Sequence, residues 1–314
     1  MLTQIFILLC SLFLVVFSAN YLVEGSGVIA KKLGVSEFLI GLFIVGMGTS
    51  LPELVVSLVG AFEKNSDVAI GNIIGSNIFN TGLILGLSAL IAPITVSKVN
   101  SKRDIPFMLM ATAIFLLLGM SDGGINRLEG FILVLFFAMY VFYLINTDGD
   151  RVDQSYEVPS GLMFQSLPGS IVIVIGSLIG LITGGKLFVD SGVQLGAMLG
   201  ISDKIIAVTV LAFGTSLPEL ATCFTALSKK RTQMALGDII GSNIFNILLI
   251  IGTSSLVHPM GFQNINIVDI MAFSGCMVTV FLSQHTTHKG TITRIDGSIM
   301  LAIFIIYMVL LFSL

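Results

Sequence analysis

Long apolar runs, separated by short polar or Gly- and Pro-marked breaks, follow one another along almost the whole chain. Most runs are about 20 residues long, the length that an α-helix needs to cross a bilayer core of about 30 Å. The runs are continuously apolar, which excludes an outward-facing β-barrel, because barrel strands alternate in polarity. The pattern predicts an all-α integral membrane protein with ten membrane-spanning helices. The spans are residues 3–24, 37–62, 68–93, 104–120, 128–145, 169–190, 203–228, 233–256, 265–283 and 295–313.

Composition and charge agree with a membrane protein. Of the 314 residues, 55% are hydrophobic and 11% are charged, against roughly 25% charged in an ordinary soluble chain, and the mean hydropathy is +1.03. The net charge is −3 and no basic stripe is present, so we expect no nucleic-acid partner. The first apolar run lacks a basic segment before it, so we expect it to be retained as a span rather than removed as a signal peptide.

Basic residues in the loops predict the orientation. Eleven of the fifteen Lys and Arg residues lie in loops that follow odd-numbered spans. Because cytoplasmic loops carry the excess of Lys and Arg, these loops are predicted to be cytoplasmic. The protein is therefore expected in the cell membrane as a multi-pass chain, with both termini on the extracytoplasmic side.

The chain contains an internal repeat with an offset of 166 residues. Gly48-Thr-Ser-Leu-Pro-Glu-Leu54 matches residues 214–220, and Ile73-Ile-Gly-Ser-Asn-Ile-Phe-Asn80 matches residues 239–246, both without a gap. The repeat predicts two halves of five spans, and because five is odd the second half must be inverted in the membrane. The predicted units are residues 1–145, a cytoplasmic linker at 146–168, and residues 169–314.

Glu53 and Glu219 are carboxylates in the middle of long apolar runs. An ionised group at that depth costs at least ~2.5–3.5 kcal/mol on insertion scales. A Glu that is neutral or paired with a basic residue would explain them, but neither span has a Lys or Arg near mid-depth. We expect bound cations to neutralise the pair.

The residues around each Glu predict oxygen ligands. Pro52 and Pro218 should break their helices and free carbonyls just upstream, at Gly46 and Ala212. Spacings of four residues place hydroxyl, carboxylate and amide groups on common helix faces. Oxygen ligands suit hard cations such as Na⁺ and Ca²⁺. We call the predicted set the oxygen cage: Glu53, Glu219, Thr49, Thr215, Ser50, Ser216, Ser76, Ser242, Asn80, Asn246 and the carbonyls of Gly46 and Ala212.

One further acidic residue near the motifs has two possible roles. Asp238, the counterpart of Asn72, is either a third carboxylate of the oxygen cage or a peripheral residue near the helix start that faces water, and the nearby charged loop favours the peripheral position. A set of glycines predicts close helix packing. They are Gly71, Gly75, Gly82, Gly86, Gly237 and Gly241.

The doubled GTSLPE and GSNIFN motifs in a ten-span chain resemble those of the sodium/calcium exchangers of the calcium/cation antiporter superfamily, especially the compact prokaryotic members. The resemblance covers essentially the whole chain. It implies a ten-helix fold with four ion sites on spans 2, 3, 7 and 8. It implies a calcium site at Glu53, Glu219, Thr49 and Thr215, and sodium sites that add Gly46, Ser50, Ser76, Asn80, Ala212, Ser216, Ser242 and Asn246.

One position departs from the family pattern. Well-studied exchangers of this type often have Asp where this chain has Asn246, so the oxygen cage is expected to carry two negative charges rather than three. The resemblance therefore leaves open the sodium stoichiometry, the proton sensitivity and any potassium dependence.

The predicted function is antiport of Na⁺ and Ca²⁺ by alternating access. Two facing carboxylates in a low dielectric disfavour an empty site, which should cross between states only when cations neutralise it. A proton- or potassium-coupled antiporter is the alternative, and a cation channel is less favoured. The sequence shows no metal-binding His/Cys set and no nucleophile–base pair, so nothing in it indicates an enzyme. We expect no cofactor besides the transported ions, contact with lipid, and function as a monomer.

Overall fold

Helices make up nearly all of the secondary structure in the computed structural model, which describes residues 1–121, 123–147, 164, 166–199, 212–262, 265–285 and 290–313. Within these ranges seven helices are long and apolar enough to cross a membrane, and a bent pair, Glu37–Thr49 with Leu51–Phe62, would make an eighth. The predicted class, an almost entirely helical chain with several membrane spans, is confirmed. The number ten stays a prediction, because residues 203–211 lie outside the described residues and Ile267–Ser283 is a shorter apolar helix.

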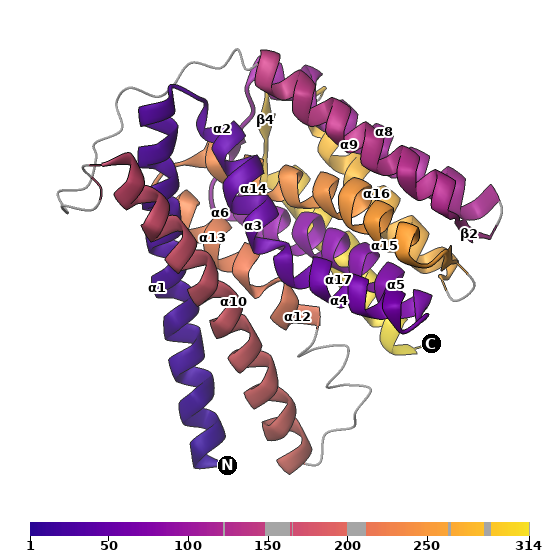
Figure 1. The fold of residues 1–314 in the computed structure, drawn as a ribbon, viewed down its shortest axis with the longest axis horizontal. Helices are drawn as coiled ribbons and strands as arrows, with labels where there is room; N and C mark the ends of the chain where they lie inside the picture. Colours follow the sequence, from indigo (N-terminus) through magenta and orange to yellow (C-terminus); the bar gives the residue numbers. More distant parts are fainter. Residues whose placement is uncertain are drawn as a thin grey trace.

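Figure 1 shows how the helices follow one another. The first half contains α1 Leu2–Leu33, α2 Glu37–Ile40, η1 Gly41–Gly46, α3 Met47–Thr49, α4 Leu51–Phe62, α5 Ser66–Ile78, η2 Phe79–Leu85, α6 Gly86–Ile91, α7 Lys98–Lys102, α8 Asp104–Ser121 and α9 Arg127–Thr147. The second half contains α10 Leu167–Met198, α12 Ala212–Thr215, α13 Leu217–Ser228, α14 Thr232–Ile244, η5 Phe245–Ile250, α15 Ile251–Val257, α16 Ile267–Ser283 and α17 Arg294–Ser313. The η segments are wound as π-helix.

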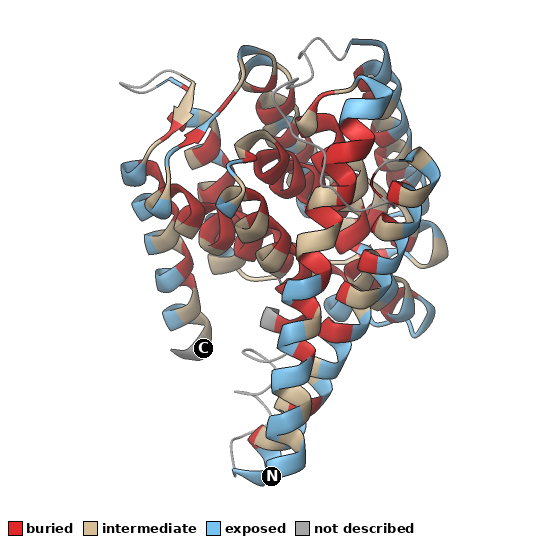
Figure 2. Cartoon of the chain, turned by 90° about the vertical axis from the view of Figure 1, so that its left-hand side faces the viewer, coloured by how far each residue is buried: buried red, intermediate tan, exposed pale blue. Residues whose placement is uncertain are grey.

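Two continuous helices form the centre of the bundle. In Thr232–Val257, 94% of the residues in the most apolar 18-residue segment are buried, and in Ser66–Ile91 the share is 78%. The corresponding shares for the helices at the periphery, such as Arg127–Thr147, are 22–44%. The helices that carry the GSNIFN motifs are therefore enclosed by the others, as the red central ribbons in Figure 2 show.

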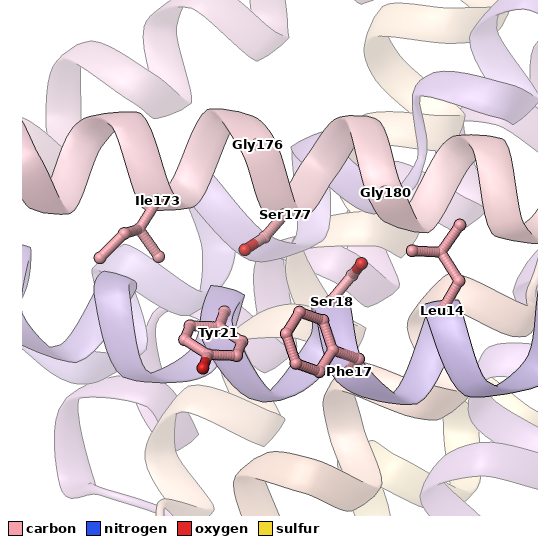
Figure 3. A pocket seen from close by; sticks show the side chains of 8 residues that line it. All are labelled: Leu14, Phe17, Ser18, Tyr21, Ile173, Gly176, Ser177 and Gly180. Atoms are coloured by element: carbon pink, nitrogen blue, oxygen red, sulfur yellow. The ribbon is translucent and has the colours of Figure 1, made fainter.

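The long helices α1 and α10 pack against each other and extend beyond the rest of the molecule (Figure 1). Small residues allow the close approach, since a Cβ atom on Gly180 would collide with Ser18 and one on Gly184 with Val15. A pocket of about 320 Å³ opens between the two helices, and Figure 3 shows its largely apolar walls. None of the oxygen-cage residues lines this pocket.

Two very short antiparallel strand pairs connect the halves of the chain. β1 Ile94–Thr95 pairs with β4 Thr291–Ile292, and β2 Gly124–Ile125 pairs with β3 Met260–Gly261. The offset of 166 places residues 94–95 on 260–261, so β1 and β3 are counterparts. In each pair one strand comes from each half. The boundaries of the predicted halves and linker stay a prediction, because residues 148–163 and 165 lie outside the described ranges.

Candidate ion-binding site

Both Gly-Thr-Ser-Leu-Pro-Glu motifs interrupt a helix, as predicted. The interruption falls at Ser50, with φ −82° and ψ 9°, and at Ser216, with φ −91° and ψ 10°. The segments before and after Ser50 are bent by 46°. The prolines lie in the first turn of the new helix, where the missing N–H group removes no hydrogen bond.

The break places each glutamate in the first turn of a 12-residue helix. Glu53 is the third residue of α4 and Glu219 the third residue of α13, where the unpaired N–H groups and the helix dipole favour a negative charge. Their relative exposures are 1% and 0%. Neither takes part in the ion pairs found among the described residues, which join other partners. The two carboxylates are therefore buried without a cationic side chain.

The hydroxyl groups around the carboxylates come mostly from the opposite half. The Ser50 hydroxyl donates to Glu219 Oε1 over 3.1 Å, and the Ser76 hydroxyl donates to Glu53 Oε1 over 3.4 Å. Thr215 lies against Glu53, and Thr49 lies against Glu219. The four-residue spacing predicted a common face for Thr49 with Glu53 and for Thr215 with Glu219, whereas the contacts in the structure run to the Glu of the opposite half.

Unpartnered oxygen atoms gather in this region. Within the described part of the chain, one oxygen of each glutamate and one side-chain oxygen of three further cage residues are buried without a hydrogen-bond partner. They are Glu53 Oε2, Glu219 Oε2, Asn80 Oδ1, Asn246 Oδ1 and Ser216 Oγ. Native proteins leave few buried polar atoms unsatisfied. Carboxylate, amide and hydroxyl oxygens are the ligands of hard cations, so the residues present fit Na⁺ and Ca²⁺.

Two asparagine pairs hold the central helices together. Asn80 Nδ2 donates to Asn243 Oδ1 over 3.4 Å, and Asn246 Nδ2 donates to Asn77 Oδ1 over 3.2 Å. The offset of 166 converts one pair into the other. Sequence reasoning missed Asn77 and Asn243, although both lie inside the doubled GSNIFN motif. Asn243 also donates to Thr81 Oγ1 over 2.8 Å.

Each π-helical segment in the described part of the chain carries a residue of the oxygen cage. Gly46 ends η1, Asn80 lies in η2 and Asn246 lies in η5. Single π-helical turns within α-helices are frequent at functional sites. The wider winding therefore coincides with the cage along all three helices.

The carbonyl of Gly46 is not free, contrary to the prediction. It accepts hydrogen bonds from the Ser50 N–H at 3.1 Å, from the Thr49 hydroxyl at 3.3 Å and from the Ser242 hydroxyl at 3.1 Å. Ser242 reaches it because Gly46 has no side chain, and a Cβ atom there would collide with the backbone of α14. The Ala212 carbonyl stays a predicted ligand.

Asp238 is buried, so the interpretation of this residue as peripheral and facing water is wrong. Its exposure is 1%, because α14 is enclosed at the centre of the bundle rather than lying at its edge. The Thr222 hydroxyl donates to Asp238 Oδ2 over 2.6 Å. Among the residues that the structure describes, no three His, Cys, Asp or Glu side chains form a cluster that could hold a metal ion. The predicted oxygen cage itself contains two carboxylates, Glu53 and Glu219, and does not include Asp238.

Comparisons with known proteins give a consistent result. The family model described as sodium/calcium exchanger protein matches residues 3–146 and 169–313. Sodium/calcium exchanger MaX1 of Methanosarcina acetivorans is 33% identical over 98% of this chain and 97% of its own. Inner membrane protein YrbG of Escherichia coli is 34% identical over 81% of this chain and 79% of its own. A solved structure of the sodium-calcium exchanger NCX_Mj superimposes with a TM-score of 0.85 at 32% identity, covering 98% of both chains.

Proposed function

The chain belongs to the sodium/calcium exchanger family, and on that premise we propose that it exchanges Na⁺ for Ca²⁺ across the cell membrane by alternating access. The family resemblance identified from the doubled motifs is confirmed. The family is one of exchangers and not of enzymes, and it does not favour the proton- or potassium-coupled alternative.

One observation supports the exchange mechanism most directly. Glu53 and Glu219 are buried, lie close enough to repel each other, and each keeps one oxygen without a partner. In a low dielectric this repulsion disfavours an empty, fully ionised site. One Ca²⁺ or several Na⁺ neutralise it, so the carrier changes state only when loaded. Competition between the two ions for overlapping oxygens then makes the exchange obligatory.

The proposed ligands follow from the predicted cage. Glu53 and Glu219, with Thr49 and Thr215, are proposed to bind Ca²⁺, and the cross-half contacts of both threonines support this set. Sodium ions are proposed to use the neighbouring hydroxyl, amide and carbonyl oxygens. These come from Ser50, Ser76, Asn80, Ala212, Ser216, Ser242 and Asn246, whereas the Gly46 carbonyl is already occupied by three hydrogen bonds.

The proposed architecture is ten spans in two inverted halves. The asparagine pairs, related by the offset of 166, and the strand pairs, in which β1 and β3 are related by 166 and β2 and β4 by 167, support an internal twofold relation. The N-terminal end of α1 and the C-terminal end of α17 lie toward the same side of the molecule (Figures 1 and 2), which agrees with an even number of crossings. The excess of basic residues in odd loops supports extracytoplasmic termini. We propose a monomer in contact with lipid.

Reconstituted vesicles test the proposed function. We expect a sodium gradient to drive uptake of radioactive Ca²⁺ by the wild-type protein, and Glu53→Gln and Glu219→Gln each to abolish it, because one carboxylate leaves Ca²⁺ half neutralised. Glu63→Gln is the matched control, since Glu63 is an exposed glutamate just beyond the end of α4. Uptake that survives either cage substitution would rule out the proposed ligands.

The same vesicles separate the alternatives. Na⁺, K⁺ and H⁺ gradients are applied one at a time, and uptake driven by a pH gradient in sodium-free buffer would favour proton coupling. A channel would carry Ca²⁺ without a counter-ion on the opposite side, whereas the exchanger requires one.

A further inference from the structure

Asp238 is a buried carboxylate that the paired-glutamate mechanism does not use. It is 1% exposed and takes part in none of the ion pairs among the described residues. Oδ2 accepts the Thr222 hydroxyl over 2.6 Å, whereas Oδ1 is buried and has no hydrogen-bond partner within the described ranges. A charged group at that depth without a counter-charge is costly, so an interaction with a cation is expected.

The carboxylate of Asp238 lies near the glutamate of the second half. The carboxylates of Asp238 and Glu219 are close enough to interact electrostatically, and Thr49 lies against both of them. Thr222 connects the two acidic residues, because its hydroxyl is also within 3.1 Å of the Glu219 carbonyl oxygen. Asp238 therefore faces the oxygen cage from the side of α13 and not the solvent.

The first half has no equivalent charge. Asn72, the counterpart of Asp238, donates its amide to the Glu53 carbonyl oxygen over 3.2 Å and to Ser57 Oγ over 3.1 Å. Its amide group is used in tying α5 to α4. The two halves thus differ at this position, since one has a donor that is satisfied and the other has an acceptor that is not.

We propose that Asp238, Glu219 and Thr49 form a Na⁺ site beside the calcium ligands, and that Asp238 supplies the third carboxylate that Asn246 does not provide. The proposal rests on the proposed exchange function. Carboxylate and hydroxyl oxygens suit a hard monovalent cation, and Glu219 is shared with the Ca²⁺ ligands, so this Na⁺ and Ca²⁺ compete. With three interior carboxylates, one more Na⁺ is needed to neutralise the sodium-loaded carrier than with two.

Equilibrium binding gives the first test. Radioactive Na⁺ is titrated into the purified wild-type protein and the Asp238→Asn variant, and we expect the variant to bind one Na⁺ fewer per chain. The substitution preserves shape and copies the Asn72 side chain of the other half. Binding of Ca²⁺ without Na⁺ should weaken, because the removed charge lies near Glu219, but the number of Ca²⁺ ions bound per chain should stay the same. Asp190→Asn, on the exposed side of α10, is the charge-matched control.

Transport equilibrium gives the second test. At zero membrane potential, the sustained Ca²⁺ ratio equals the Na⁺ ratio raised to the number of Na⁺ ions exchanged per Ca²⁺. With a tenfold Na⁺ gradient, loss of one coupled Na⁺ lowers the sustained Ca²⁺ ratio about tenfold in Asp238→Asn. Thr222→Val, which removes only the hydroxyl that orients Asp238, should weaken Na⁺ binding without changing the number bound.

Either of two results would overturn the proposal. One is an unchanged Na⁺ count and an unchanged Ca²⁺ ratio in Asp238→Asn. The other is an unchanged Na⁺ count with an altered pH dependence, which would make Asp238 a proton-binding group. Failure of the exchange function itself is a separate result, because it would be seen in wild-type flux, whereas Na⁺ binding is measured without transport.

Discussion

Asn246 is a proposed sodium ligand that places an uncharged amide at the centre of the bundle. It is fully buried, its Nδ2 donates to Asn77 Oδ1 over 3.2 Å, and its Oδ1 has no hydrogen-bond partner within the described ranges. An amide oxygen at this position offers a ligand without a charge. The cage can therefore accept a cation here without adding repulsion to the empty state.

We expect Asn246→Asp to tighten Ca²⁺ binding about tenfold or more. Two opposite unit charges about 4 Å apart attract by about 4 kcal/mol at an effective dielectric of about 20, and a divalent ion doubles this. A tenfold gain, about 1.4 kcal/mol, therefore remains even after desolvation and repulsion among the carboxylates offset most of the attraction. Equilibrium binding of radioactive Ca²⁺ measures the change. Asn80→Asp, the counterpart at the same register, should act in the same direction, and unchanged affinity in both variants would contradict the charge argument.

The sequence predicted the ion-binding residues, but not which of them contact one another across the two halves. Glu53 and Glu219 were predictable because a doubled motif repeats an unpaired carboxylate in an apolar run. The threonine partners were not, since they depend on how the chain turns at the break. The burial of Asp238 depends on which helices enclose α14, and no local pattern encodes that.

At the element scale, glycines allow α14 to pack directly on the backbone of α2 and η1. A Cβ atom on Gly237 would collide with the backbone of Phe38, and one on Gly241 with that of Leu42. Their counterparts Gly71 and Gly75 have no described atom within reach of a Cβ. The predicted role of these glycines in packing therefore holds for Gly237 and Gly241, but no described contact supports it for Gly71 and Gly75.

Because the two counterpart glycines differ in their surroundings, substitutions of Gly241 and Gly75 can be compared as a matched pair. Gly241→Ala should destabilise the protein by about 1–3 kcal/mol, because the added methyl group forces two backbones apart. Gly75→Ala should have little effect or raise stability slightly, since alanine favours helix. Thermal unfolding in detergent compares the two variants. If both variants lost the same stability, close packing of α14 on η1 would not explain the destabilisation of Gly241→Ala.

The π-helical segments could not be predicted from the sequence, although the helix breaks could. The helix breaks follow from Pro52 and Pro218, whose chemistry is local. In contrast, η2 and η5 contain no proline, so no local residue predicts their wider winding.

At the scale of the whole molecule, ion pairs hold the two halves together at one end. Lys229 pairs with Glu24 over 2.5 Å, and Arg231 pairs with Glu37 over 3.4 Å. They connect α1 and α2 to the turn between α13 and α14. At the offset of 166, Glu63 replaces Lys229, so the equivalent pair at the other end would have two acidic partners. The two ends of the molecule therefore differ in electrostatic stability.

We expect Lys229→Gln to change the ratio of the Ca²⁺ affinities measured from the two sides of the membrane by about two- to fivefold. A partly exposed pair contributes less than about 1 kcal/mol, and its loss should favour the state that is open at that end. Oriented vesicles assayed from each side provide the measurement. The exchanged pair Glu24→Lys with Lys229→Glu should restore the ratio, and equal changes on both sides would contradict the assignment.

The strand pairs were beyond prediction, because two residues are too few to show the alternation of a strand. They have a consequence for biosynthesis. β1 and β2 are made early, but their partners lie at residues 260–292, after most of the second half. β1 and β2 therefore have no partner strands while the ribosome makes the rest of the chain. The strand pairs of the first half can form only after the last part of the second half has been made.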